Sequence, residues 1–265
     1  MNIESQKQQL DQQGYIVIEN VLSPNIVKDY VLRLNNIYSQ LQESGKHLYP
    51  GGLGTTEKLI MNLHNKDYEF LNLLDHSAIT PFLKHLLCAG SYGNCEPYIL
   101  NQCSARDPHL GAQAQQLHID SRFPGPPFAL TAIALWMLND FSKPSGGTHV
   151  IPGSHRNPSY PGNGVIYENK AIVEAPAGSV LIYNGSLWHG GGAKVIDVER
   201  WSVVTTYSRW FVKPSMDFTK NTPQALYKLL SPARKELFGF TVIPPHNEFQ
   251  RARTRINIED LPEAL

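Results

Sequence analysis

From Pro97 to about residue 212, the chain consists of short runs rich in β-branched and aromatic residues, separated by turns that contain Gly and Pro. The repetition of such runs at short intervals indicates an antiparallel β-sandwich or barrel. No helical pattern of convincing length separates them, so a parallel βαβ sheet and a dinucleotide-binding fold are disfavoured. The predicted strands are Tyr98–Cys103, Ala129–Leu138, Thr148–Ile151, Ala171–Glu174, Val180–Tyr183 and Trp201–Tyr207.

Helical segments are expected on both sides of this β-rich region. A short strand over Tyr15–Val21 precedes Ser23-Pro24, which supplies an N-cap and a first-turn proline for a helix. A second helical region is predicted over Leu71–Leu87, and further helix starts are indicated at Thr80-Pro81, Thr222-Pro223 and Ser231-Pro232. We therefore predict one domain over residues 1–265, with a helical N-terminal part (about 1–96), a β core (about 97–212) and a helical C-terminal segment (about 213–265).

Charge and composition exclude several classes of protein. The 23 Lys and Arg residues balance the 23 Asp and Glu residues, so no net charge attracts nucleic acid or an anionic membrane surface. The glycine-rich segment 47–56 is not followed by the Gly-Lys-Ser/Thr of a phosphate-binding loop and is expected to be a surface loop. The longest apolar run, Phe128–Leu138, is too short for a transmembrane helix.

The three cysteines, Cys88, Cys95 and Cys103, lack the paired spacing of a structural zinc site or a redox dithiol. They are expected to be reduced, mostly buried thiols. The polar N-terminus lacks the apolar segment of a secretory signal. These features predict a soluble cytoplasmic protein, and three arginines near the C-terminus, Arg251, Arg253 and Arg255, are expected to form a solvated basic patch.

His118-Ile119-Asp120 places an imidazole and a carboxylate two residues apart, so on an extended segment both point to the same side of the chain. A second histidine would complete a set of two His and one carboxylate, which leaves positions open on iron(II) for a chelating cosubstrate and dioxygen. The candidates are His149, His155 and His189. His189 is favoured because it follows a predicted strand and a turn and precedes three glycines, whereas His149 and His155 have ordinary explanations in a strand and a turn.

Arg200 opens the last predicted strand, eleven residues after His189. The period of two along a strand places Arg200, Ser202 and Val204 on one face, and a guanidinium followed by a hydroxyl is suited to bind a carboxylate. Arg209 has the opposite parity and ranks second. Two other functions fit parts of this pattern: a hydrolase or hydratase with a two-His, one-Asp zinc site, in which Arg200 has no role, and a silent binding protein that keeps the fold alone.

These residues and their order resemble the phytanoyl-CoA dioxygenase family of iron(II)- and 2-oxoglutarate-dependent oxygenases. The resemblance covers residues from about 10 to 240 and rests on five elements: the opening Gly14–Ser23, His118-x-Asp120, the segment Ser145–His155, Leu187-Trp-His189 and Arg200. It implies a mainly β fold with flanking helices, built on a double-stranded β-helix (a cupin-like jelly roll). It also implies iron bound by His118, Asp120 and His189, and the distal carboxylate of 2-oxoglutarate bound by Arg200.

The resemblance implies further roles in the cosubstrate pocket. Trp136 matches a tryptophan that lines this pocket, and Gln115 and Thr148 match groups that contact 2-oxoglutarate; Gln102 and Ser202 are further polar candidates. The implied reaction consumes O2, releases succinate and CO2, and hydroxylates, demethylates, desaturates or otherwise oxidises a small molecule, with natural-product biosynthesis as the setting and ascorbate as an optional reductant. Asp120 excludes halogenation, because halogenating relatives carry a small residue there. The protein is expected to be a monomer or a homodimer.

Overall fold

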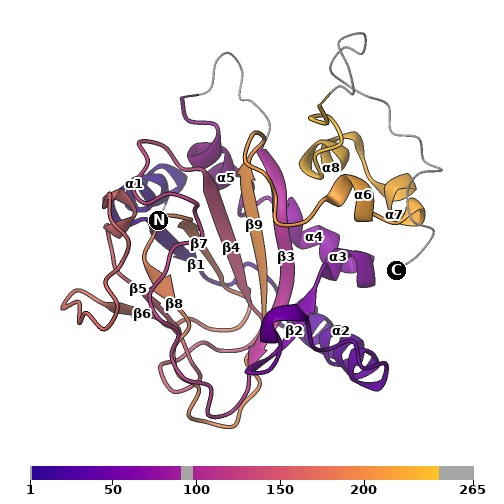
Figure 1. Cartoon of the computed structure of the whole chain (residues 1–265), viewed down its shortest axis with the longest axis horizontal. Coiled ribbons are helices and arrows are strands. Elements are labelled where there is room, and N and C mark those ends of the chain that lie inside the picture. The colour runs from indigo at the N-terminus through magenta and orange to yellow at the C-terminus, as the bar shows by residue number, and fades with distance from the viewer. Residues whose placement is uncertain (1, 91–97, 245–265) are drawn as a thin grey trace.

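The computed structural model describes residues 2–90 and 98–244, in which two antiparallel sheets pack against each other (Figure 1). The six-stranded sheet contains, in spatial order, β1 (Tyr15–Ile18), β7 (Val180–Asn184), β4 (Thr131–Met137), β9 (Ser202–Arg209), β3 (Tyr98–Pro108) and β2 (Glu57–Met61). The three-stranded sheet contains β6 (Ala171–Val173), β5 (Thr148–Val150) and β8 (His189–Gly190).

Helices lie before and after the sandwich in sequence. Their bounds are α1 (Ile3–Gln13), α2 (Pro24–Glu43), α3 (Leu63–Lys66), α4 (Leu71–Leu74), α5 (Thr80–Leu87), α6 (Phe218–Asn221), α7 (Gln224–Leu229) and α8 (Pro232–Leu237). Four of them, α2, α5, α7 and α8, begin at or directly after the Ser-Pro and Thr-Pro pairs that indicated helix starts, and two of these have a serine cap. The Ser23 hydroxyl accepts a hydrogen bond from the Ile26 N–H at 3.5 Å, and that of Ser231 accepts one from the Arg234 N–H at 3.2 Å, so both serines cap the first turn of a helix.

The strand β4 separates two apolar cores, because successive side chains on a strand point to opposite faces. Ala134 and Trp136 belong to the larger core, which the helices cover. Ile133 and Leu135 belong to the smaller core and pack there with Val150 of the three-stranded sheet. The space between the two sheets is therefore lined by the Leu135 face of β4, and this is where the candidate site lies.

The mainly β class with flanking helices is confirmed, and so are the six strands predicted after residue 97, with shifted ends. The elements that were not predicted are α1, α3, α6, β2 and β8, of which α1 and β2 are the longest. α1 is polar along almost its whole length and buries only Leu10, so it carries little apolar periodicity. β2 follows the glycine-rich loop and is defined by its pairing with the second half of β3, which extends to Pro108 rather than ending at Cys103. The single-domain division stays a prediction.

The cysteines differ from expectation. Cys88 is disulfide-bonded, which corrects the prediction that all the cysteines are reduced. Cys103 is a free thiol, and complete burial raises its pKa to about 12, so it is not a reactive thiolate. Cys95 and the basic patch of Arg251, Arg253 and Arg255 lie outside the described residues. Over residues 2–90 and 98–244, none of the helices has the length and apolar character needed to cross a membrane.

Candidate active site

His118 and His189 lie side by side because their main chains form an antiparallel bridge. The His118 N–H donates to the His189 carbonyl oxygen at 2.8 Å, and the His189 N–H donates to the His118 carbonyl oxygen at 3.0 Å. The bridge places His118 beside β8, on the edge of the smaller sheet that β5 does not occupy. Main-chain pairing therefore holds the two imidazole rings together, with centroids 4.4 Å apart.

Both imidazoles are oriented by a hydrogen bond at Nδ1. The Nδ1 atom of His118 lies 2.9 Å from the carbonyl oxygen of Gln116, and that of His189 lies 2.9 Å from the carbonyl oxygen of Leu187. Because a carbonyl oxygen can only accept, each Nδ1 is the donor, and in the neutral form of each imidazole Nε2 then keeps a free lone pair. Histidines that bind metals through Nε2 usually make this second contact.

Asp120 completes the set. Its Oδ1 lies 3.9 Å from His118 Nε2, and its Oδ2 lies 3.4 Å from His189 Nε2. One ligand atom from each of the three residues lies within 4.8 Å of the others, and no second group of three or more such residues occurs in the described chain. Burial lowers the pKa of His189, which favours the neutral, metal-binding form. Two imidazole nitrogens and a carboxylate fit a divalent ion such as iron(II).

The two alternative histidines lie elsewhere. His155 has its Nε2 3.1 Å from the carbonyl oxygen of Asp11, so it holds the N-terminal helix against the sandwich. His149 is on β5 and borders a separate cavity beside the 162–167 loop. The structure thus brings His189, and neither of the others, to His118 and Asp120.

Tyr183 is a site residue that the sequence analysis missed. Its hydroxyl donates to Asp120 Oδ2 at 3.0 Å and lies 3.2 Å from His189 Nε2. The side chain is 3% exposed, and burial together with the charge of Asp120 raises its pKa well above the usual value. The parity of the predicted strand 180–183 and its position six residues before His189 were the available signals, but they do not reveal which face of the strand is the inner one.

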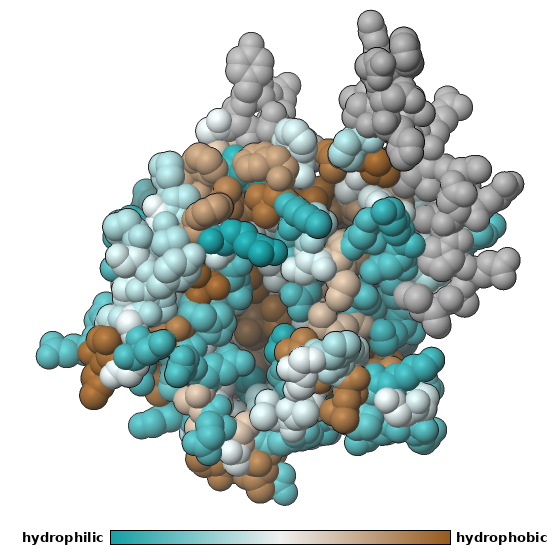
Figure 2. Space-filling view, in the orientation of Figure 1, coloured by the Kyte–Doolittle hydropathy of each residue, from teal (hydrophilic) through white to brown (hydrophobic). Residues whose placement is uncertain are grey.

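A cavity of about 530 Å³ opens from the three ligands toward Arg200. Figure 2 shows this face of the molecule hollowed, with apolar atoms at the base of the hollow and hydrophilic side chains around it. Strand pairing arranges part of the wall in rows: Thr206 is opposite Gln102, and Ser202 is opposite Arg106. The cavity wall includes four of the predicted cosubstrate residues, Gln102, Gln115, Thr148 and Ser202. Their roles stay predictions.

Trp136 is not part of this wall. It lies on the helix-covered face of β4, completely buried, with its ring 5.3 Å from that of His76. Its neighbour Leu135 faces the cavity instead. The expectation that Trp136 lines the cosubstrate pocket is therefore corrected. The physical reason is strand parity: a shift by one residue moves a side chain to the opposite face of the sheet.

Arg200 is a buried cation without a carboxylate hydrogen-bonded to its guanidinium group among the described residues. It is 5% exposed, its Nε has no hydrogen-bond partner, and its guanidinium carbon lies 3.8 Å from the centre of the Phe141 ring. Burial lowers its pKa to about 10, while Asp107 and Glu57 act in the opposite direction. A buried guanidinium that lines a cavity with an unpaired nitrogen is suited to receive an anion.

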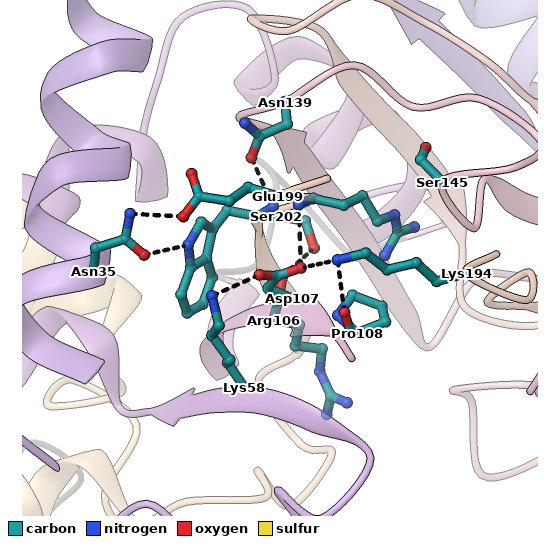
Figure 3. A network of polar contacts seen from close by, with 12 residues as sticks. Asn35, Lys58, Arg106, Asp107, Pro108, Asn139, Ser145, Lys194, Glu199 and Ser202 are labelled. Atoms are coloured by element: carbon teal, nitrogen blue, oxygen red, sulfur yellow. Dashed lines mark hydrogen bonds and ion pairs between the residues drawn. The ribbon is translucent and has the colours of Figure 1, made fainter. Parts of the chain in front are cut away.

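The polar network around Asp107 in Figure 3, which includes Lys58 and Lys194, also holds the backbone of Arg200. Asp107, 2% exposed, accepts a hydrogen bond from the Arg200 main-chain N–H at 3.1 Å. Two ammonium groups also converge on Asp107: Lys194 Nζ at 2.9 Å and Lys58 Nζ at 3.0 Å. The Asp107 carboxylate thus binds the two ammonium groups and the Arg200 main-chain N–H, and the Arg200 side chain lines the cavity.

Arg209, the second candidate for a carboxylate receptor, has a structural role. Its Nε donates to the Ala129 carbonyl oxygen at 2.8 Å and its Nη2 donates to the Ala89 carbonyl oxygen at 2.6 Å. The guanidinium carbon also lies 4.6 Å from the centre of the Phe128 ring. Arg209 does not line the cavity that contains Arg200. Of the two arginines, only Arg200 is placed to meet a ligand near the histidines.

Known proteins are similar to this chain in sequence. Dioxygenase af480 of Aspergillus fumigatus is 25% identical over 252 residues, which cover 92% of this chain and 79% of af480. Dioxygenase trt7 of Aspergillus terreus is 23% identical over 252 residues, covering 91% of this chain and 85% of trt7.

Two solved structures are similar to this one. HygX from Streptomyces hygroscopicus, solved with nickel and 2-oxoglutarate bound, has a TM-score of 0.64 and 16% identity, covering 81% of this chain and 89% of HygX. The non-heme alpha ketoglutarate dependent epimerase SnoN from nogalamycin biosynthesis has a TM-score of 0.64 and 19% identity, covering 83% of this chain and 89% of SnoN. These likenesses confirm the predicted jelly-roll core.

The family comparison agrees with the geometry of the site. A sequence model of the family described as phytanoyl-CoA dioxygenase matches residues 10–200, a range that contains both histidines, Asp120 and Arg200. The match covers well over half of the chain and ends on the arginine that lines the cavity. The chain belongs to the phytanoyl-CoA dioxygenase family.

Proposed function

We propose that this protein is a non-haem iron(II)- and 2-oxoglutarate-dependent dioxygenase that oxidises a small molecule and releases succinate and CO2. The observation that carries this function is the combination, in one cavity, of two imidazole nitrogens and a carboxylate with a buried arginine whose guanidinium has no carboxylate hydrogen-bonded to it among the described residues. The metal ligands alone also suit zinc hydrolysis, but Arg200 has no task in a hydrolase.

Each residue has a distinct task in the reaction. His118, Asp120 and His189 would hold the metal, and the Arg200 guanidinium would bind the distal carboxylate of 2-oxoglutarate. When bound, iron(II) and 2-oxoglutarate would supply the oxidising chemistry. Tyr183 donates to Asp120 and keeps its carboxylate oriented. Gln102, Gln115, Thr148 and Ser202 offer hydrogen bonds along the wall between the metal ligands and Arg200.

The finer parts of the proposal concern setting and partners. The similarity to SnoN from nogalamycin biosynthesis supports a role in tailoring a natural product. A cytoplasmic location is proposed because iron(II) and 2-oxoglutarate must both be available, and ascorbate is proposed as the reductant that restores oxidised iron. The protein is proposed to act as a monomer or a homodimer.

Anaerobic binding tests the metal and cosubstrate sites. Purified protein should bind one iron(II), and addition of 2-oxoglutarate should produce a visible charge-transfer band. His118→Ala and His189→Ala should lose metal binding, whereas the control His155→Ala should retain it and show a lower melting temperature, because His155 holds the N-terminal helix. Absence of the band in folded, iron-loaded wild-type protein would rule out the oxygenase function.

Turnover separates the proposed function from its alternatives. Iron-loaded protein should convert 2-oxoglutarate to succinate in air, and a substrate should accelerate this conversion. A zinc hydrolase or a silent binding protein would form no succinate above the level of a His189→Ala control. A screen of small molecules for faster succinate release would then identify the substrate.

A further inference from the structure

A second, smaller cavity adjoins the metal ligands on the side of Asp120 away from Arg200. It has a volume of about 80 Å³ and shares Gln102, Asp120 and Thr206 with the main cavity. Its remaining wall consists of Asn101, Arg122, Thr131, Val212, Lys213 and Ser215. Because they share these three residues, the two cavities are adjacent, and the Asp120 carboxylate lines both of them.

Strand register places this cavity far from Arg200. Ser202 is opposite Arg106, Thr206 is opposite Gln102, and Ser208 is opposite Thr131, so the three pairs follow β9 in the direction away from Arg200. At about 3.3 Å per residue, Thr206 lies roughly 13 Å along β9 from Ser202. Arg200 and Ser202 line the main cavity and not the small one, so the small cavity is at the end of the site away from the arginine proposed to bind 2-oxoglutarate.

The small cavity carries an excess of positive charge. Arg122 and Lys213 line it, and the only carboxylate in its wall is Asp120, a metal ligand. Neither cation takes part in an ion pair with a described residue. Other cations near the site differ: Arg106 is paired with Glu57, and Lys194 is paired with Asp107 at 2.9 Å. Two unpaired cations in the wall of one cavity are suited to bind a negatively charged group.

Arg122 and Lys213 are both exposed residues, and hydrogen bonds hold the backbone near each of them. The Tyr160 hydroxyl donates to the Arg122 carbonyl oxygen at 3.2 Å, and the N–H groups before Arg122 are tied to Gly185. On the other side, Asn101, which is 7% exposed, accepts hydrogen bonds from the Ser215 N–H at 3.1 Å and the Ser215 hydroxyl at 2.8 Å. The cations thus extend from two positioned segments.

Aromatic side chains accompany the cations in sequence. Phe123 follows Arg122 and is 65% exposed, and Phe211, two residues before Lys213, is 53% exposed. Exposed large aromatics are suited to contact an apolar ligand. The two segments that bring the cations to the cavity therefore also carry exposed aromatic rings.

We propose that Arg122 and Lys213 bind an oxyanion group of the substrate, and that the substrate carries this group on an apolar, ring-containing body. This inference rests on the proposed function and extends it by naming the substrate class. Because the small cavity shares Asp120 with the metal site, an anion bound there holds the adjoining carbon skeleton beside the metal. The two cations act as specificity-determining residues.

Calorimetric binding to protein loaded with nickel(II) and 2-oxoglutarate tests this inference. The probe is 2-naphthalenesulfonate, whose anion is a weak metal ligand, and its matched neutral analogue is 2-naphthalenesulfonamide. An exposed ion pair contributes up to about 1 kcal/mol, or roughly fivefold in affinity. Wild-type protein should therefore prefer the sulfonate by about 5- to 25-fold. Arg122→Gln and Lys213→Gln should each reduce this preference by about 2- to 5-fold, and the double variant should abolish it.

Controls separate this inference from the proposed function. Lys220→Gln removes an exposed surface cation that pairs with Asp217 and should keep the wild-type preference. Affinities for 2-naphthoate and 2-naphthyl phosphate, measured in the same way, then rank carboxylate, sulfonate and phosphate. Equal binding of the two probes, binding of neither, or a preference that survives in the double variant overturns the inference. Failure of the protein to bind 2-oxoglutarate would instead overturn the proposed function.

Discussion

The hydroxyl oxygen of Tyr183 lies 3.0 Å from Asp120 Oδ2 and 3.2 Å from His189 Nε2, so one buried phenol contacts two of the three metal ligands. A metal that takes the Nε2 lone pair of His189 leaves Asp120 as the acceptor for this hydroxyl. The phenol then restricts how the carboxylate can rotate. Tyr183 is a positioning residue for the metal site.

Tyr183→Phe should weaken metal binding about 10- to 100-fold, the usual effect of removing a group that orients a metal ligand. Titration of the apoprotein with cobalt(II), followed by visible absorption, measures this affinity. Tyr207→Phe is the matched control, because the Tyr207 hydroxyl donates to the Leu74 carbonyl oxygen at 2.8 Å in the helix-covered core. That variant should lower the melting temperature and keep the metal affinity. If Tyr183→Phe keeps the wild-type affinity for cobalt(II), Tyr183 does not position the metal ligands.

Arg200→Ala should weaken binding of 2-oxoglutarate to the metal-loaded protein by roughly 30-fold to several thousand-fold, because truncating one member of a buried charge pair costs about 2 to 5 kcal/mol. Arg200→Lys should lie between, since an ammonium cannot make the two parallel hydrogen bonds. Arg209→Ala should keep the affinity but lower the stability, because Arg209 donates to the Ala129 and Ala89 carbonyl oxygens. Anaerobic titration of all three variants decides between the two arginines.

Asp107→Asn should lower both the stability and the affinity for 2-oxoglutarate. Lys194 is 4% exposed and would lose its counter-charge, and breaking a buried pair costs about 3 to 5 kcal/mol. The double variant with Lys194→Met should recover part of this loss, because the unpaired charge is gone. Denaturant unfolding measures the free energies. Metal affinity should stay at the wild-type level, since Asp107 contacts none of the three metal ligands; a parallel loss of metal would show general disruption instead.

His64 should make the protein less stable as the pH falls. It is completely buried, neither ring nitrogen has a hydrogen-bond partner, and burial, with a smaller effect of Lys66, lowers its pKa to about 3. The unfolded chain binds a proton near pH 6.5 and the folded chain does not. His64 therefore costs about 2 kcal/mol of stability between pH 7.5 and pH 5. His64→Leu should make the free energy of unfolding, measured by denaturant unfolding, less dependent on pH in this range. The control His85→Gln changes a histidine that pairs with Asp11 and should keep the pH dependence caused by His64.

The local sequence determined the parts of this protein that depend on short-range geometry. A capping serine before a proline predicts the start of α2 whatever the rest of the chain does. Likewise, His118 and Asp120 share a side of an extended segment, and so do Arg200 and Ser202, because a strand alternates with period two. Both pairs line the same cavity. The strand, turn and glycines around His189 favoured it as the second histidine, and the family resemblance agreed.

Tertiary structure decided which face of each strand is the inner one and which distant groups meet. Alternation gives Leu135 and Trp136 opposite faces, but only the packing of helices on one face places Trp136 in the helix-covered core and Leu135 in the cavity. The sequence also left open which face of the strand carrying Tyr183 is the inner one, so it did not identify Tyr183 as a site residue. The bridge between His118 and His189 and the convergence of Lys58 and Lys194 on Asp107 join segments far apart in the chain. Such contacts depend on chain topology, which no local pattern encodes.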